Sequence, residues 1–246
     1  MKKEKIIYET LDLFPVPVIR VKYPKAQSLR KIIKPIFYDM ENHDKTNFKY
    51  SANSHTSYAT NLAGYGAKDK PNYSSALEST HWAGHELLSA IPELKDLRNF
   101  ILQTGIKANN FIGIDKNVES LMFQGSWFSI NRKYGYHGYH SHMPGLWSGV
   151  YYVQAVNEDS AITFLDTNKK HNWPSAYSMF SENPYSAPSV CIPPETGMLI
   201  IFPSWLEHGV EQQMDDRERI TISFNLNPKP STEQMQTQKE RVEALS

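Results

Sequence analysis

The residues best suited to chemistry are histidines that gather in one short segment. His137, His140 and His142 lie within six positions, directly before an apolar, β-type run at residues 147–153. Residues two apart on a strand face the same side, so His140 and His142 can point together at one metal ion. His208 follows later in the chain, at the start of another β-type run. Two ligands close in sequence and one distant ligand suit a half-open octahedral metal site, which leaves positions free for catalysis.

The remaining histidines have no such context. An isolated histidine is usually a surface or hydrogen-bonded residue, and we therefore expect no metal at His43, His55, His81, His85 or His171.

A second candidate feature is an arginine at the start of a strictly alternating segment, residues 219–226. Its odd positions, Arg219, Thr221, Ser223 and Asn225, share one face, while its even positions are all apolar. A buried arginine without an anionic partner is costly, and a planar guanidinium pairs well with a carboxylate. The pattern therefore predicts that Arg219 binds a carboxylate. The alternative is an arginine at an exposed strand end that pairs with Glu218 or Asp216.

The elements that must position these residues are helices in the first half of the chain and strands in the second. Helical spacing predicts a helix over residues 27–40, which Pro35 should kink or shorten. It predicts a second helical segment over residues 79–103, broken near Pro92 and with a stop near Gly105. Residues 41–75 are expected to be a loop. An edge strand is predicted at residues 16–23, and further strands at residues 119–131, 147–154, 161–165, 197–202, 209–213 and 219–226. This layout predicts an α+β fold, a β-sandwich or jelly roll with helices covering one outer face.

Composition favours an ordinary globular protein. The 246 residues carry 26 Lys+Arg and 26 Asp+Glu, which gives no electrostatic footprint for nucleic acid or an anionic membrane. Cys191 is the single cysteine and cannot form an internal disulfide. A signal-peptide core and an apolar run long enough to span a membrane are both lacking. We therefore expect a cytoplasmic protein.

Three segments together resemble a known family. HSHMPGLWSGVYYV (residues 140–153), GMLIIFPSWLEHGV (197–210) and RITISFNL (219–226) are similar to the 2-oxoglutarate–Fe(II) oxygenases of bacteria and phages, in the prolyl-hydroxylase-like branch. The early LFPVPVIRV segment resembles the usual start of such chains. The resemblance implies a double-stranded β-helix (jelly roll, cupin-like) over residues 119–227. Residues 1–118 would support this barrel with a strand, helices and a long loop, and residues 228–246 would form a polar tail.

The resemblance also implies roles for single residues. His140 and His142 would be the proximal ligands of Fe(II) and His208 the distal one, with 2-oxoglutarate chelating the metal. Arg219, with the help of Thr221, would hold the far carboxylate of 2-oxoglutarate. Asn131 and Tyr151 lie on strands that line the pocket in this family. One departure stands out, because the superfamily usually has H-x-D or H-x-E where this chain has His142. Asp166 is the alternative third ligand.

The implied reaction uses O2 and 2-oxoglutarate to hydroxylate a small-molecule or peptide substrate, and it releases succinate and CO2. The aromatic residues Trp127, Tyr139 and Trp147 are candidates for a substrate wall, unless they belong to the core. Two alternatives from other classes stay open. One is a cupin-like metalloenzyme that does not use 2-oxoglutarate, and the other is a non-catalytic β-sandwich that binds a partner or has a structural role.

Overall fold

The computed structural model describes residues 15–43, 50–51, 54–55, 58–60, 87–114, 120–156, 161–166 and 187–229. Its helices are α1 (Ala26–His43), α2 (Leu87–Ala90), the 3-10 turn η1 (Pro92–Leu94) and α3 (Lys95–Phe111). Its strands are β1 (Ile19–Lys22), β2 (Tyr50–Ser51), β3 (Ser54–His55), β4 (Tyr58–Thr60), β5 (Leu121–Asn131), β6 (Tyr136–His140), β7 (Trp147–Gln154), β8 (Ile162–Leu165), β9 (Ser189–Ile192), β10 (Met198–Pro203), β11 (His208–Val210) and β12 (Arg219–Pro228).

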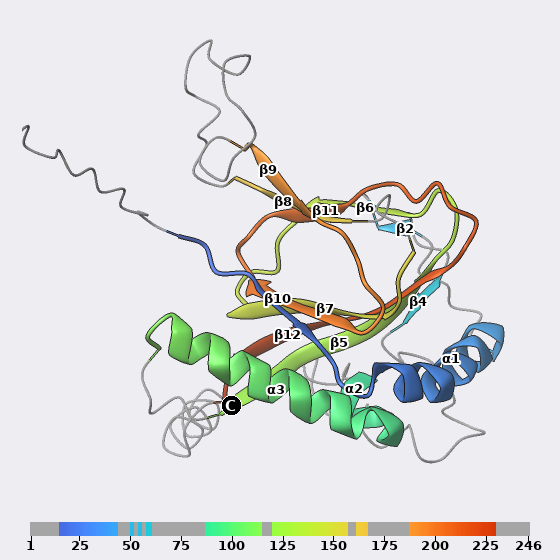
Figure 1. Ribbon diagram of the computed structural model, residues 1–246, viewed down its shortest axis with the longest axis horizontal. Coiled ribbons are helices and arrows are strands. Elements are labelled where there is room, and N and C mark those ends of the chain that lie inside the picture. The colour runs from blue at the N-terminus through green and yellow to red at the C-terminus, as the bar shows by residue number, and fades with distance from the viewer. Residues whose placement is uncertain are drawn as a thin grey trace, which may run out of the picture.

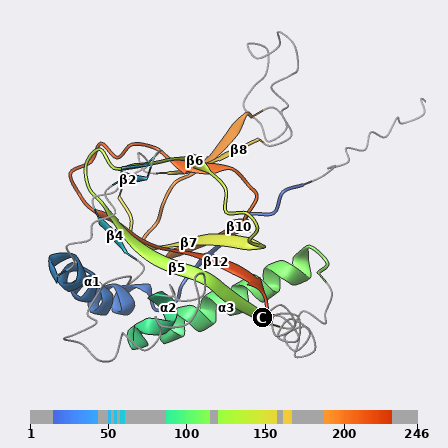
Figure 2. The same ribbon diagram turned by 180° about the vertical axis from the view of Figure 1, so that it is seen from behind.

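Two antiparallel sheets of six strands face each other. One has the order β1-β10-β7-β12-β5-β4 and the other β2-β3-β6-β11-β8-β9. Helices α1, α2 and α3 lie along the outer face of the first sheet (Figure 1), and the view from behind shows the same layers (Figure 2). The prediction of an α+β jelly roll with helices on one outer face is confirmed.

The first sheet separates two hydrophobic clusters, and its strands supply residues to both. On the helix side, Ile220, Ile222 and Phe224 of β12 pack with Ile33 of α1 and Ile101 of α3. On the other side, Tyr152, Met198, Ile200 and Phe202 of the first sheet pack with Ile162 and Phe164 of the second sheet and with Leu206 of the turn before β11. Because successive side chains on a strand point to opposite faces, each central strand can serve both clusters. The inner cluster is the smaller one, which leaves room for polar residues between the sheets.

Both predicted helices end later in the chain than their sequences suggest. Pro35 lies inside α1 and does not end it, since Ile33 and Phe37 on either side are fully buried and hold the helix on the sheet. Gly105 lies inside α3 and is not a stop signal. A Cβ atom at Gly105 would lie 2.7 Å from Leu121 Cδ1 and 3.0 Å from Leu226 Cδ1. This glycine therefore lets the helix approach the sheet closely.

The seven predicted strands are all present. The strand at 147–154 has the predicted ends and the other six have shifted ends, and β1 is the edge strand that its prolines indicated. β6 and β9 were not predicted, and β2, β3 and β4 lie in the segment expected to be a loop. The tail beyond residue 229 lies outside the described residues. No helix in the part of the chain that the structure describes is long and apolar enough to cross a bilayer.

Candidate metal centre

Three histidines from two neighbouring strands converge at one end of the space between the sheets. His140 ends β6, His142 follows two positions later, and His208 begins β11 opposite His140. Their available ligand atoms all lie within 4.8 Å of one another. The ring centroids are 4.5 Å apart for His140 and His208, 4.8 Å for His140 and His142, and 5.2 Å for His142 and His208. One small cation can contact all three imidazoles at this spacing.

The chemistry of this donor group suits a divalent metal. His140 Nδ1 lies 2.7 Å from the carbonyl oxygen of Gly138, and His208 Nδ1 lies 2.9 Å from that of Leu206. When Nδ1 donates to a carbonyl, the tautomer is fixed and Nε2 is left with a lone pair for a metal. Burial lowers the pKa of His142 to about 4 and that of His208 to about 3. Both rings are therefore neutral at neutral pH, which is the form that binds metal.

Asp166, the alternative third ligand, does not belong to this group. Among the described residues the cluster consists of His140, His142 and His208. The backbone of Asp166 instead continues the pairing next to β9, because its N–H donates to the carbonyl oxygen of Pro188 at 2.9 Å.

The histidines form one end of a pocket whose wall is the inner face of the first sheet. Arg219, Thr221 and Ser223 of β12 line it, as their alternation predicted. Arg219 is only 2% exposed, and burial lowers the pKa of its guanidinium to about 10. It still carries its charge at neutral pH, so an anionic ligand in the pocket would stabilise it. The acids considered as its surface partners pair elsewhere, Glu218 with Arg132 and Asp216 with Lys133.

The remaining predicted residues divide between the pocket and the layers around it. Asn131 is fully buried behind the pocket, where its Nδ2 lies 3.2 Å from Nε2 of His137. Tyr151 does not reach the pocket. Its ring packs in the helix-side cluster, 5.9 Å from that of Tyr23, and the adjacent Tyr152 faces the pocket in its place.

The three aromatic candidates for a substrate wall lie in three different parts of the structure. Trp127 lines the pocket, with its ring centroid 5.8 Å from that of His142. Trp147 lies in the helix-side cluster, where its indole N–H donates to Asn109 Oδ1 at 2.7 Å. Tyr139 lines a shallower hollow beside Val210 and Glu211. Only Trp127 of the three is therefore a candidate to contact a substrate in this pocket.

Several pocket residues were not predicted. The clearest are His137, Tyr152, Ser148 and Val150. Tyr152 and Ser148 follow from strand alternation once the phase of β7 is known, whereas His137 reaches the pocket only because β6 is irregular.

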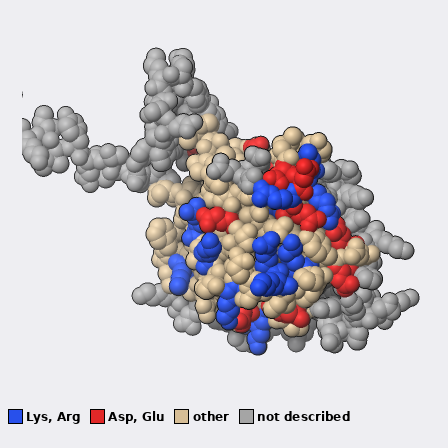
Figure 3. All heavy atoms as spheres, turned by 45° about the vertical axis from the view of Figure 1, so that its right-hand side comes forward, with Lys and Arg blue, Asp and Glu red and all other residues tan. Residues whose placement is uncertain are grey.

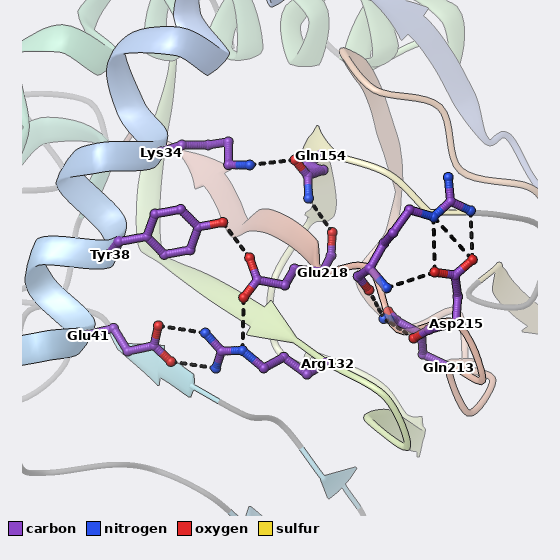
Figure 4. A network of polar contacts seen from close by, with 9 residues as sticks. Lys34, Tyr38, Glu41, Arg132, Gln154, Gln213, Asp215 and Glu218 are labelled. Carbon is purple, nitrogen blue, oxygen red and sulfur yellow. Dashed lines mark hydrogen bonds and ion pairs between the residues drawn. The ribbon is translucent and has the colours of Figure 1, made fainter.

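A polar network fixes the strand ends next to Arg219 against helix α1 (Figure 4). Arg132 donates to both carboxylate oxygens of Glu41, at 2.6 and 2.8 Å, and to Glu218 Oε1 at 2.9 Å. The Tyr38 hydroxyl donates to the other oxygen of Glu218, and burial together with this carboxylate raises the pKa of Tyr38. Because Glu218 directly precedes Arg219, the network holds the start of β12 in place.

Replacement of Arg132 by methionine is expected to lower the free energy of unfolding by about 1–3 kcal/mol. Methionine keeps the aliphatic stem but leaves two partly buried carboxylates, Glu41 and Glu218, without their cation. The matched control is Lys133→Met. Lys133 pairs with Asp216 at 3.0 Å, and Asp216 is 85% exposed, so a loss below about 1 kcal/mol is expected. Urea denaturation measures both values, and equal losses would contradict a special role for the network.

The surface of the molecule carries charges of both signs. On the face drawn in Figure 3, basic and acidic side chains lie side by side rather than in separate areas of one sign. This mixture is in keeping with the equal numbers of basic and acidic residues in the sequence.

Comparison with known proteins finds one family whose model matches the part of the chain that forms the pocket. Residues 125–225 match the family described as "Putative 2OG-Fe(II) oxygenase". This range contains every residue of the donor group and the whole polar face of β12 up to Asn225. No curated protein matches the chain in sequence.

Solved structures share the fold at low sequence identity. A non-heme alpha ketoglutarate dependent carbocyclase, SnoK from nogalamycin biosynthesis, is 12% identical over 86% of this chain and 79% of its own, with a TM-score of 0.53. A Pseudomonas putida prolyl-4-hydroxylase is 12% identical over 87% and 94%, with a TM-score of 0.48. An oxidoreductase of the 2OG-Fe(II) oxygenase family from Burkholderia pseudomallei is 12% identical over 45% and 46%, with a TM-score of 0.34. The aligned part thus spans about half of this last chain. The SnoK likeness supports the predicted double-stranded β-helix fold.

Proposed function

We propose that this chain, whose residues 125–225 match the 2-oxoglutarate–Fe(II) oxygenase family, hydroxylates a C–H bond of a small molecule or peptide. In this reaction 2-oxoglutarate, O2 and the substrate become succinate, CO2 and an alcohol. One oxygen atom of O2 enters succinate and the other enters the alcohol, so atoms and electrons balance. The proposal also includes a cytoplasmic location. It further includes the division of the chain into a supporting part (residues 1–118), a catalytic barrel (119–227) and a tail (228–246).

The observation that carries the proposal is that one pocket contains both a candidate metal-binding group and a buried cation. Three imidazoles converge at one end, with burial lowering the pKa values of His142 and His208, and a buried guanidinium lies in the wall. 2-Oxoglutarate has matching ends, since its 2-oxo acid can chelate a metal and its far carboxylate can pair with an arginine. A single cosubstrate would thus satisfy both features.

In this proposal His140, His142 and His208 would hold Fe(II), which supplies oxidation by O2 coupled to decarboxylation of 2-oxoglutarate. Three neutral ligands leave the charge of the metal uncompensated, so the site depends more strongly on the carboxylates of the cosubstrate. Arg219 would bind the far carboxylate, and the Thr221 hydroxyl, two residues along the same face of β12, would donate a second hydrogen bond. Together they orient the cosubstrate with its 2-oxo acid toward the histidines.

Aromatic residues would keep water from the reacting end. The rings of Phe202 and Phe164 lie 4.6 and 6.1 Å from that of His208, between centroids. The ring of Trp127 lies beside that of His142. An apolar surround strengthens the electrostatic hold of the site on its anionic ligand and limits side reactions. Trp127 is our candidate for contact with the substrate.

The test is turnover of 2-oxoglutarate by Fe(II)-loaded protein. Succinate, measured by NMR, should form in the presence of O2 and stop when a chelator is added. A candidate substrate that is hydroxylated should gain one oxygen atom by mass spectrometry. If succinate forms but the substrate gains no oxygen atom, the protein is a 2-oxoglutarate-dependent enzyme that catalyses an oxidation other than hydroxylation. Activity that needs metal but ignores 2-oxoglutarate would favour the cupin-like alternative, and no metal binding would favour the non-catalytic one.

The proposal implies that His142 is a ligand although the superfamily usually has a carboxylate at that position. His142→Ala should weaken Fe(II) binding strongly, and His142→Asp should restore part of it, because an aspartate recreates the common H-x-D pair. Asp166→Ala should leave Fe(II) binding unchanged. Iron content per chain after gel filtration measures all three. If Asp166→Ala loses iron while His142→Ala keeps it, Asp166 is the ligand and His142 is not.

A further inference from the structure

A fourth histidine faces the pocket without joining the metal-binding group. Among the described residues, His137 lines the pocket together with His140, His142 and His208, yet the metal-binding cluster contains only the latter three. Its position three residues before His140 makes this arrangement unexpected, since residues three apart on a regular strand face opposite sides.

A β-bulge accounts for the position of His137. In the pairing of β6 with β11, His140 lies opposite His208, whereas His137 lies opposite Val210, so β6 has one extra residue between them. Residues directly opposite each other on paired strands share a face, and His208 and Val210, two apart, share one as well. His137 therefore faces the same side as His140. Bulges commonly re-aim a side chain in this way next to functional sites.

Neighbouring residues hold the His137 ring in a defined orientation near Arg219. Asn131 Nδ2 lies 3.2 Å from His137 Nε2. When the amide donates to Nε2, the neutral ring carries its proton on Nδ1 and has that one N–H to offer. Asn131 also lies directly opposite Arg219 in the pairing of β5 with β12, so these two side chains share a face. Burial lowers the pKa of His137 to about 3, and the positive charge of Arg219 is the next largest cause.

From this arrangement we infer that His137 is a second binding residue for the far carboxylate of 2-oxoglutarate, to which it donates a hydrogen bond from Nδ1 beside Arg219. The inference rests on the proposed function and adds a residue to it. The bulge in β6 then has a role, because it turns His137 of the second sheet toward the carboxylate of 2-oxoglutarate. The charge of Arg219, on the first sheet, holds the same carboxylate. The carboxylate is bound from both sheets.

The experiment compares two cosubstrates that differ only at the far end. Calorimetry on Mn(II)-loaded protein measures the binding of 2-oxoglutarate and of 2-oxopentanoate, in which a methyl group replaces the far carboxylate. His137→Phe should weaken 2-oxoglutarate binding by about tenfold or more, the usual effect of losing a hydrogen bond to a charged group. It should leave 2-oxopentanoate and Mn(II) binding unchanged. His137→Asn should keep most of the affinity, because its amide nitrogen can stand where Nδ1 was.

The outcomes separate the inference from the proposed function. Unchanged 2-oxoglutarate affinity in His137→Phe, with normal binding by the wild type, would overturn only the role of His137. Equal weakening for both cosubstrates, or failure of His137→Asn to restore binding, would assign His137 a purely structural role and also overturn the inference. If wild-type protein binds neither cosubstrate, the proposed function fails and the inference with it. Thermal unfolding of each variant shows that the measured protein is folded.

Discussion

Alanine in place of His208 is expected to abolish stoichiometric Fe(II) binding. His208 supplies the ligand that comes from β11, across from the pair on and after β6. Its ring is buried, and its Nδ1 is already oriented by the Leu206 carbonyl. Removal leaves two ligands only two positions apart in sequence, with no third group to close the site. Even residues that only orient a metal ligand typically contribute 10–100-fold to affinity, so loss of a ligand should exceed about a hundredfold.

Iron content per chain, measured after removal of loosely bound metal, checks this expectation. His171→Ala is the control, because the sequence gives no reason for His171 to bind metal. His171 lies outside the described part of the chain. This control variant should keep one Fe(II) per chain. Full occupancy in His208→Ala would mean that the three histidines are not the ligand set.

Where polar and apolar residues alternate, the sequence alone was enough to predict which side chains face the pocket. In β12 the apolar residues Ile220 and Ile222 pack under the helices, so Arg219, Thr221 and Ser223 must face the other sheet. The H-x-H pair and the distant His208 were likewise recognisable from spacing. These features depend on local periodicity, which a sequence displays directly.

Where both faces of a strand are apolar, the phase could not be predicted. Tyr151 and Tyr152 are both aromatic and both 1% exposed, and β7 contributes to both hydrophobic clusters. Nothing in the local pattern says which tyrosine faces the pocket. The pairing with β10 and β12 decides it, and that pairing is formed by residues about 50 to 75 positions away.

The bulge in β6 was hidden for a related reason. Tyr136–His140 is short, polar and largely exposed, so no hydrophobic alternation marks it as a strand. Its irregularity exists only relative to β11, more than 60 positions later. A bulge is a property of two strands together. His137 was therefore visible in the sequence as part of a histidine cluster, but its direction was not.

Arg219→Ala is expected to weaken 2-oxoglutarate binding by well over tenfold while Fe(II) still binds. Truncating one partner of a buried charge pair typically costs about 2–5 kcal/mol, much of it because the other charge is left buried without a partner. Arg219 is 2% exposed and lies in the pocket wall, so water can replace it only poorly. Arg219→Lys should recover part of the loss, because lysine keeps the charge but not the planar, two-pronged donor.

A second arginine, two residues earlier, makes the matched control for this measurement. Arg217 pairs with Asp215 at 2.6 Å, and its side chain is 61% exposed. Arg217→Ala removes the same charge from the same part of the chain, so it should leave 2-oxoglutarate binding nearly unchanged. If calorimetry gives equal affinities for Arg219→Ala and wild type, Arg219 does not bind the cosubstrate. If both arginine variants weaken binding equally, the effect is one of overall charge. Only a loss confined to Arg219 places the far carboxylate of 2-oxoglutarate at the start of β12.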